Sequence, residues 1–540
     1  MSNMHTHGIC VKETATLIQP PITAATPATA LGTAPIHLAT NPAQANVPVL
    51  CHTLAEFVEQ FGWSDDFDKY SLCEVAQVHF RLFNVAPVVF VNVLDTTKHS
   101  KQSTAQVEGV SNPATVSAPI LLSTLKISSG AKPVEKAIIG VTGNDINIPD
   151  EIDVDNFTVK AGDETLTLTT DYTVAKAKIT LTTAGAAKVD GNLTFTSGED
   201  TYVELIADTD YTAEHDSQGN VVITVLDDDK VVDDKISLSY KEIDSSMVAA
   251  SDIIGGVDIN TGKNTGLELI EEIYPRFGMI PGQLIAPKWS MNSAVATIMA
   301  AKAADINGVF KGIALADVTA DKYTDLNALK NGSNLIDPFL ILTYPKVSLG
   351  GVQYHLSTQA AALMCAVDAD NDDLPFVSPS NHNLQCDDAE VFLGKSQANY
   401  LNGIGIVTAL NFIGGHRLWG NRTSAYPSTS DVKDCFISVR RMFNYIANTL
   451  VLSYWSRIDA PINRTFVESL VDEANLWLNA LTKVGSLLGG RVEFLQDDNP
   501  EINLLDGQVV FRVYIAPPIP AETITFTLSY DVDALSSLFS

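Results

Sequence analysis

One stretch of this chain differs so strongly in composition from the rest that it must form a module of its own. Between Val107 and Ala250 there are 25 acidic and 10 basic residues, and there is no Arg, Trp or Cys. This stretch therefore supplies half of the net charge of −30 that the 540-residue chain carries. A break of this size marks a domain boundary, and we predict a separate acidic domain over residues 107–250.

Within this acidic stretch, β-branched and polar residues alternate between turns that contain Gly or Asp. The clearest alternating segments are residues 165–169, 178–182 and 221–225. A period of two is typical of strands with one buried face, so we expect an all-β domain, sandwich or barrel-like. Thr170-Asp171-Tyr172-Thr173 recurs 39 residues later as Thr209-Asp210-Tyr211-Thr212, which indicates two related β units.

The sequence on either side of the acidic stretch alternates helical and strand patterns. This order predicts an α/β body with a mainly parallel sheet, into which the β domain is inserted, and the whole chain as an α/β and α+β multidomain protein. The proline-dotted N-terminus and the alternating C-terminus predict extended arms. The expected parts are an arm at 1–34, an αβ unit at 35–106, the β domain at 107–250, an α/β core at 251–425, a helical and strand domain at 426–520 and a C-terminal strand arm at 521–540.

Composition also limits the partners of the chain. Its 64 acidic residues against 34 Lys and Arg give a surface that repels phosphate backbones, so we expect no nucleic-acid partner. No apolar run reaches the roughly 18 residues that a spanning helix needs, and the first residues lack a secretory pattern. We therefore expect no membrane insertion and assembly in a cytoplasm.

Several short motifs resemble chemical sites without meeting their requirements. Gly256 to Asn264 has the wrong glycine spacing for a phosphate loop, and Asp368 to Asp373 lacks the glycine and glutamate of a calcium loop. We interpret the first as a turn and the second as a solvated loop. The six cysteines form no CxxC pair, and no G-x-S-x-G motif is present. The sequence thus predicts no catalytic, cofactor-binding or metal-binding residue and no enzyme activity.

A resemblance to a known family is carried by several segments in the right order along the chain. They are His7-Gly8-Ile9, Gly32-Thr33-Ala34-Pro35, residues 87–95, residues 252–266, Trp419-Gly420-Asn421-Arg422-Thr423, Val439-Arg440-Arg441 and residues 515–522. Each segment is weak evidence alone, but their collinear combination is specific. Together they resemble the contractile phage tail sheath family, in which the region of the acidic domain is the most variable part.

The resemblance implies a structural function. Sheath subunits of this family stack as hexameric rings around an inner tail tube and contract to drive the tube through the target cell envelope. The implied partners are other copies of the chain, the inner tube protein, and the baseplate and tail terminator proteins, with no cofactor. The implied location is the virion tail, assembled in the host cytoplasm. The sheath of a phage-tail-like bacteriocin or another contractile injection system remains an alternative, as does a hydrolase with an unrecognised site.

Two sets of residues follow as candidates for contacts between subunits. Family members lend terminal strands to the sheets of their neighbours, and the alternating residues at both ends suit this role. The candidates for strand exchange are Ile9, Val11, Leu17, Ile524 and Phe526. A predicted helix over 463–484 has an apolar stripe that includes Trp477 and Val484. Its opposite face carries Arg464, Glu468, Asp472, Asn475 and Asn479, and the first three are candidates for facing the tube.

Overall fold

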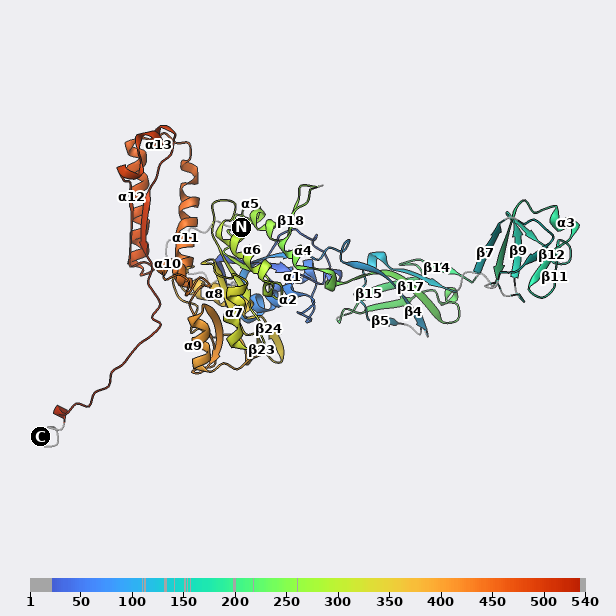
Figure 1. Cartoon of the computed structure of the whole chain (residues 1–540), viewed down its shortest axis with the longest axis horizontal. Coiled ribbons are helices and arrows are strands. Elements are labelled where there is room, and N and C mark those ends of the chain that lie inside the picture. The colour runs from blue at the N-terminus through green and yellow to red at the C-terminus, as the bar shows by residue number, and fades with distance from the viewer. Residues whose placement is uncertain are drawn as a thin grey trace, which may run out of the picture. The chain divides into compact units, whose positions relative to one another are not determined.

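The computed structural model describes residues 22–534, apart from residues 109, 111–112, 131–133, 140, 150–151, 153, 156, 198–200, 217 and 260. The chain divides into two compact units (Figure 1). Unit 1 combines residues 1–98 with residues 245–540, and unit 2 comprises residues 99–244. Unit 2 thus begins and ends a few residues before the limits of 107 and 250 that composition predicts.

Unit 1 is built on one eight-stranded sheet in the order β2-β3-β1-β20-β21-β22-β26-β27. Its inner strands run parallel, and only the edge strands β2 and β27 are antiparallel to their neighbours. Every residue of β3 is buried, as expected for a parallel strand covered on both faces. The bounds are β1 Ile22–Gly32, β2 Val49–Cys51, β3 Val85–Asn92, β20 Gln283–Ile285, β21 Ile313–Asp317, β22 Leu340–Tyr344, β26 Ile406–Asn411 and β27 His416–Trp419.

The N-terminal strand β1 corrects the predicted arm over residues 1–34. It lies between β3 and β20 and pairs in parallel with both, and Ala28, Ala30 and Leu31 are fully buried. From Ile22 on, the chain is therefore part of its own subunit's core. The pairing register with β3 shifts between Thr23 and Ala28, which accommodates Pro27 in a strand that a proline would otherwise interrupt.

Helices connect and cover the strands of the sheet. Helix α8 contacts β1, β3, β20, β21 and β22, and nearly all of its residues are buried because its many Ala and Ser side chains allow close approach to the sheet. The helices before the C-terminal domain are α1 Leu54–Phe61, α2 Ser71–Ala76 (continued by a π-helical segment, Gln77–Leu82), α4 Ala250–Ile254, α5 Ile270–Phe277, α6 Ser293–Ala304, α7 Leu326–Gly332, α8 Leu356–Ala369 and α9 Lys395–Gly403. Two small sheets join β18 Gly256–Val257 to β19 Asn264–Thr265 and β23 Val347–Leu349 to β24 Val352–Tyr354 and β25 Asp388–Ala389.

The C-terminal part of unit 1 is a helical hairpin with a two-stranded sheet. Helices α11 and α12 contribute buried side chains to one apolar cluster, which includes Met442, Ile446, Leu478 and Leu481. The elements are α10 Val432–Cys435, α11 Ile437–Tyr454, α12 Arg464–Lys483, β28 Gly489–Glu493, α13 Glu501–Leu505 and β29 Arg512–Ala516.

Unit 2 contains two β-sandwiches, which we call the flanking sandwich (β4–β6 with β14–β17) and the nested sandwich (β7–β13). Each has a four-stranded and a three-stranded sheet, in the orders β14-β6-β17-β4 with β15-β16-β5, and β10-β9-β13-β7 with β11-β12-β8. Taken in chain order, the seven strands occupy the same sheet positions in both. The bounds are β4 Ser100–Glu108, β5 Ala114–Val116, β6 Lys126–Ser129, β7 Val134–Ile139, β8 Asp145–Asn147, β9 Phe157–Ala161, β10 Glu164–Leu166, β11 Tyr172–Val174, β12 Lys178–Leu181, β13 Asn192–Ser197, β14 Val203–Leu205, β15 Tyr211–His215, β16 Val221–Val225 and β17 Lys235–Ile243, with a short helix α3 Thr183–Ala186.

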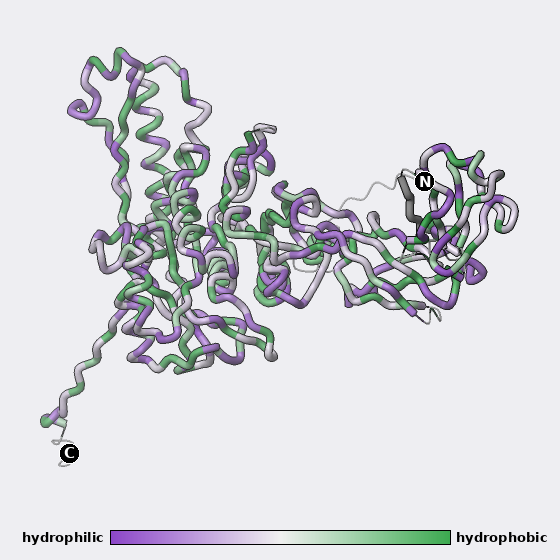
Figure 2. Tube along the Cα trace, turned by 45° about the vertical axis from the view of Figure 1, so that its right-hand side comes forward, coloured by the Kyte–Doolittle hydropathy of each residue, from purple (hydrophilic) through white to green (hydrophobic). Residues whose placement is uncertain are grey.

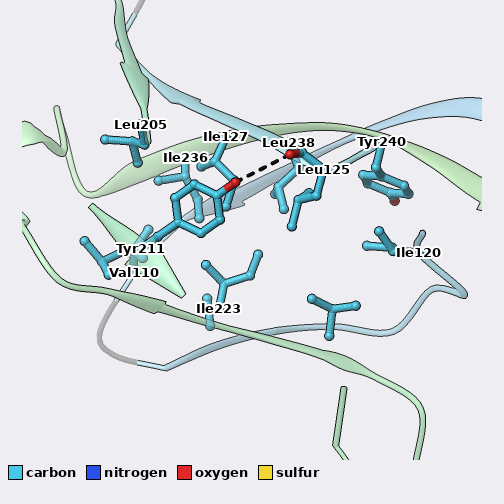
Figure 3. Packing of buried hydrophobic residues seen from close by; sticks show 13 residues of the cluster. Val110, Ile120, Leu125, Ile127, Leu205, Tyr211, Ile223, Ile236, Leu238 and Tyr240 are labelled. Carbon is cyan, nitrogen blue, oxygen red and sulfur yellow. Dashed lines mark hydrogen bonds between the residues drawn. The ribbon is translucent and has the colours of Figure 1, made fainter. Parts of the chain in front are cut away.

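Each sandwich has its own apolar core between its two sheets. In the flanking sandwich, Ile127 and Leu238 of one sheet pack with Tyr211 and Ile223 of the other, and the Tyr211 hydroxyl donates a hydrogen bond to the Leu125 carbonyl (3.4 Å; Figure 3). Strand β17 alternates buried and exposed residues, which is the period-two pattern of a half-buried strand.

The repeated tetrapeptide forms the same turn in both sandwiches. Asp171 accepts a hydrogen bond from the Thr167 amide and Asp210 from the Ile206 amide, each at 2.8 Å. A lysine then reaches each carboxylate, Lys188 at 3.1 Å and Lys230 at 2.6 Å. The turn holds a residue with positive φ three positions before the buried tyrosine, at Thr169 and Asp208. The two segments therefore fold alike because the same backbone and carboxylate contacts recur.

Strand β4 shows why the predicted boundary at residue 107 lies too late. Its nine residues pair with β17 along their whole length, from Ser100 with Ile243 to Glu108 with Lys235. Because most of its side chains are Ser, Lys, Gln and Thr, the strand has too little apolar alternation to be recognised from the sequence.

A candidate assembly surface at the C-terminus

The C-terminal segment continues from β29 without a partner strand in its own subunit. Residues 517–531 have no helix or strand, so the strand expected over 523–530 is not formed in the single chain that the structure describes. Figure 2 shows the hydropathy of this segment along the chain. Its main-chain donors and acceptors are therefore available to another sheet.

Apolar side chains recur at every second position of this segment. These five side chains are between 66% and 94% exposed. They are Ile524, Phe526, Leu528, Tyr530 and Val532. Exposed large apolar side chains in a regular row mark a surface that a partner covers. Their period of two indicates that the partner is a sheet, because an extended strand places alternate residues on one face.

The segment is fixed to the body of unit 1 by one bidentate ion pair. Arg422 donates to Glu522 through Nε (2.8 Å) and through Nη2 (2.6 Å). The guanidinium also lies over two aromatic rings, at 3.8 Å from the Phe436 centroid and 4.4 Å from the Tyr426 centroid. The pair joins two of the segments that carried the family resemblance, 419–423 and 515–522, which sequence alone did not connect.

A cavity of about 530 Å³ lies beside this ion pair. Its walls combine Pro520–Thr523 with Trp419, Asn399 and Asn402 of the body. The Asn402 amide donates to the Ile406 and Trp419 carbonyls, so this amide is held by its own neighbours. The C-terminal segment thus forms one wall of the cavity.

The two-stranded sheet beside α12 offers strand edges. In the part of the chain that the structure describes, β28 and β29 pair only with each other. The sheet is fixed to α12 by Asn475, which accepts from the Val492 amide (2.9 Å) and donates to the Val492 carbonyl (3.1 Å). Gly490 packs against Leu478, where a Cβ would lie 3.2 Å from the Leu478 Cβ. The outer edge of β29 can therefore accept a further strand, whereas the outer edge of β28 is bonded by Asn475 at Val492.

The candidate residues for strand exchange and tube contact fall in different places. Ile9, Val11 and Leu17 lie outside the described residues. Ile524 and Phe526 lie in the exposed C-terminal row, at 72% and 85% exposure.

The three candidates for facing the tube lie on α12. Arg464, Glu468 and Asp472 are all exposed, and Arg464 donates to Glu468 at 2.6 Å. The exposed pair leaves this face polar, which suits a contact that has to be released.

Two other assignments on this helix are wrong. Asn475, placed with the exposed face, is half-buried because it bonds β28. Val484, placed in the apolar stripe, is exposed because α12 ends at Lys483, and Leu478 is fully buried in the stripe instead.

Two buried ion pairs hold the elements of unit 1 together. Glu74 of α2 accepts from the His355 ring Nδ1 (2.7 Å) and from the His355 amide (2.6 Å) at the start of α8. Burial lowers the pKa of His355, but the carboxylates of Glu74 and Asp317 raise it, and the net shift places the pKa above its usual value. Arg441 of α11 donates to Asp368 of α8 in a second pair. Asp368 is therefore buried in a helix, which corrects the solvated loop expected from its acidic neighbours.

A third buried cluster surrounds Asp317 at the carboxyl end of β21. Its carboxylate accepts from the Ser357 amide (3.0 Å), the Ser357 hydroxyl (2.5 Å) and the Thr343 hydroxyl (2.8 Å). All three residues are at most 5% exposed, so this network links β21, β22 and α8. In the described part of the chain, no group of three or more His, Cys, Asp or Glu side chains could hold a metal ion. None of the helices described is long and apolar enough to cross a membrane.

Comparison with known proteins identifies similar tail sheath proteins. No protein-family model matches the chain. The chain is 29% identical to the tail sheath protein of Burkholderia phage BcepMu over 320 residues, which cover 56% of this chain and 65% of that protein. It is 31% identical to the major tail sheath protein of Serratia phage KSP20 over 147 residues, 26% of this chain and 36% of that one. These similarities support a contractile tail sheath family for the chain.

Solved structures of sheath proteins align with this chain at low sequence identity and low TM-score. The sheath tail protein of Desulfitobacterium hafniense aligns with a TM-score of 0.45 and 9% identity over 95% of this chain and 100% of that one. The contracted helical sheath of the anti-feeding prophage aligns with a TM-score of 0.42 and 21% identity over 51% and 76%. These TM-scores lie below 0.5, so the identification depends on the sequence relatives. Since those relatives are structural proteins of phage tails, they suggest a non-enzymatic role in a tail or tail-like particle.

Proposed function

We propose that this chain is a sheath subunit that polymerises as stacked hexameric rings around an inner tube and contracts to drive the tube through a target envelope. The observation that carries the proposal is the exposed row from Ile524 to Val532. A single subunit gains nothing from exposing five large apolar side chains, whereas covering each contributes about 1.5 to 3 kcal/mol. The row therefore favours a polymer over a monomer.

The partner of this row is a sheet edge of a second copy. The edge of β29 supplies unpaired main-chain groups, and the strand carries the exposed apolar side chains Val513 and Tyr514, one on each face. Strand addition combines main-chain hydrogen bonds, each worth about 0.5 to 1.5 kcal/mol net, with pockets for alternate side chains. We propose the same role for Ile9, Val11 and Leu17 at the other end of the chain. Main-chain links of this kind keep subunits joined while side-chain contacts rearrange.

The remaining partners follow from the same assembly. We propose that Arg464, Glu468 and Asp472 face the inner tube, and that the baseplate and terminator proteins bind the two ends of the polymer. We also propose that unit 2 is an insertion that projects outward, since insertions are tolerated at exposed loops. Assembly in the host cytoplasm and no cofactor complete the proposal.

The test compares two sets of substitutions on opposite faces of the C-terminal segment. Replacing Ile524, Phe526 and Leu528 by Ser should leave a folded subunit with an unchanged Tm, because these side chains are exposed, but should abolish polymers seen by electron microscopy. Thr525→Ser with Thr527→Ser changes the other face and should polymerise as the native chain does. Regular sheaths formed by the triple variant would refute the proposal.

A further inference from the structure

We infer that Arg422 and Glu522 are positioning residues that aim the C-terminal strand at its acceptor sheet. The inference rests on the proposed function and adds what holds the strand before it docks. The proposed strand exchange gives no role to Arg422 or Glu522, because neither residue belongs to the exposed apolar row. The inference supplies that role. The two residues are 100 positions apart in the chain and meet in one contact.

The contact fixes a direction as well as a position. Two parallel N–H···O bonds between a planar guanidinium and a carboxylate allow one relative orientation. The Phe436 and Tyr426 rings hold the guanidinium plane, and Arg422 keeps only 15% of its side chain exposed. Lysine could not replace this arrangement, since it has neither the planar fork nor the stacking surface.

The backbone around Arg422 is anchored as firmly as its side chain. Arg422 forms a β-bridge with Phe436, and its neighbour Thr423 donates through its amide to the Cys435 carbonyl (2.9 Å). The Thr423 hydroxyl donates to the Asp434 carbonyl (2.5 Å). Arg422 therefore belongs to the rigid body of the subunit, so its ion pair holds Glu522 at a fixed position.

The chain between the body and the ion pair is also stiff. Pro517, Pro518 and Pro520 lie between the end of β29 at Ala516 and Glu522. Prolines in such density favour an extended, semi-rigid backbone. With the pair formed, Ile524 follows the last fixed residue by two positions. Without it, the last fixed residue is Ala516, and the seven residues 517–523 separate it from the strand.

This difference sets how much of the chain is ordered before the strand docks. The acceptor is on a second copy, so the pair acts by fixing the direction of the strand in advance, which lowers the ordering cost of docking. Glu522 is 41% exposed and can be screened by salt, and an exposed pair of this kind changes docking by about two- to fivefold. The pair thus aims the strand in a free subunit while remaining weak enough to release when the lattice contracts.

The experiment uses the full chain with Glu522→Gln, which keeps the size of the side chain and removes its charge. Glu501→Gln is the matched control, because Glu501 is an exposed residue of the same domain. Spin labels at Ser396 and Ser529 report the distance distribution in the monomer, and light scattering reports the polymerisation rate. We expect a broad distribution and about two- to fivefold slower polymerisation for Glu522→Gln only, with sheaths of native form at the end.

Each outcome separates this inference from the proposed function. An unchanged distance distribution in Glu522→Gln, or a broad distribution with a native polymerisation rate, overturns the positioning role. If the Ser triple variant of the apolar row also polymerises normally, it is the proposed function that fails. Restored rate and narrow distances in Glu522→Asp, which keeps the charge, would support the role of the ion pair over that of the side-chain length.

Discussion

The buried pair of Glu74 and His355 offers a direct test of how the first αβ unit is tied to the later core. Glu74 is fully buried and His355 is 3% exposed, and they are 281 positions apart. Glu74→Gln preserves the shape of the side chain but removes the charge that both His355 donors face. The loss of folding stability depends on pH, because the protonation state of His355 decides whether a buried positive charge is left without its partner.

The magnitude follows from the raised pKa of His355. Stabilisation from its protonation is fully present below its usual pKa of 6.5 and is lost as pH rises through the folded-state pKa. At pH 5.5, Glu74→Gln leaves a buried imidazolium without a partner, which costs about 3 to 5 kcal/mol. Once the pH has risen above the folded-state pKa the imidazole is neutral, and the loss is that of hydrogen bonds to a charged group, about 1.5 to 3 kcal/mol.

Tryptophan fluorescence during urea unfolding measures this loss selectively. All five tryptophans lie in unit 1, at positions 63, 289, 419, 455 and 477. Glu59→Gln, on the exposed side of α1, is the matched control and should stay within about 0.5 kcal/mol of the native chain. A loss of unfolding free energy below about 1 kcal/mol at pH 5.5, or a loss that grows with pH, would show that the pair does not contribute this stability.

Three further perturbations address unit 2 and the tube-facing helix. Replacing residues 131–200 by Gly-Asp, the turn that joins β9 to β10, should leave the flanking sandwich and sheath assembly intact by circular dichroism and electron microscopy; aggregation would contradict this. Glu468→Lys with Asp472→Lys should keep the Tm but reduce assembly on tubes, and unchanged tube-guided assembly would remove these residues from the interface. A hydrogen bond from Lys230, with another from the Ile206 amide, holds the pKa of Asp210 below its usual value, so its stabilisation is lost as pH falls through that lowered pKa. Asp210→Asn should therefore lower the Tm of unit 2 at pH 7 and flatten its acid dependence in calorimetry, and an unaltered acid profile would refute the assignment.

Sequence patterns predicted those elements whose own residues carry the signal. Helix α1 begins and ends where its apolar spacing indicates, and the valine-rich β3 is recognisable because every residue is buried. Strand β1 was assigned to an arm because Pro27 interrupts it, although the sheet accommodates that proline by a register shift. Local signals therefore fail where a tertiary partner overrides propensity.

The candidate site was predicted only in part, because some of its contacts join segments that are far apart in the sequence. The alternation of Ile524, Phe526 and Leu528 is local and was visible, whereas the fixed start of the segment at Glu522 depends on Arg422, 100 residues earlier. Likewise, Asp368 looked solvated among acidic neighbours, because its partner Arg441 comes 73 residues later. Charged pairs between distant segments leave no periodic trace in a single sequence.

The nesting of one sandwich inside the other has a consequence for how the chain folds. Strand β6 ends at Ser129, which pairs with Val203. The two residues are separated by 73 others. Closing a flexible loop of that length first would be entropically costly, but the pairing of Val134 with Ser197 inside the nested sandwich brings the loop's ends together. Folding the nested sandwich first leaves about nine residues to close and reduces the closure cost by about 2 kcal/mol. Because its strands also leave the ribosome before β14, the nested sandwich acts as a folding template, and slowing its formation slows the closure of the sandwich around it.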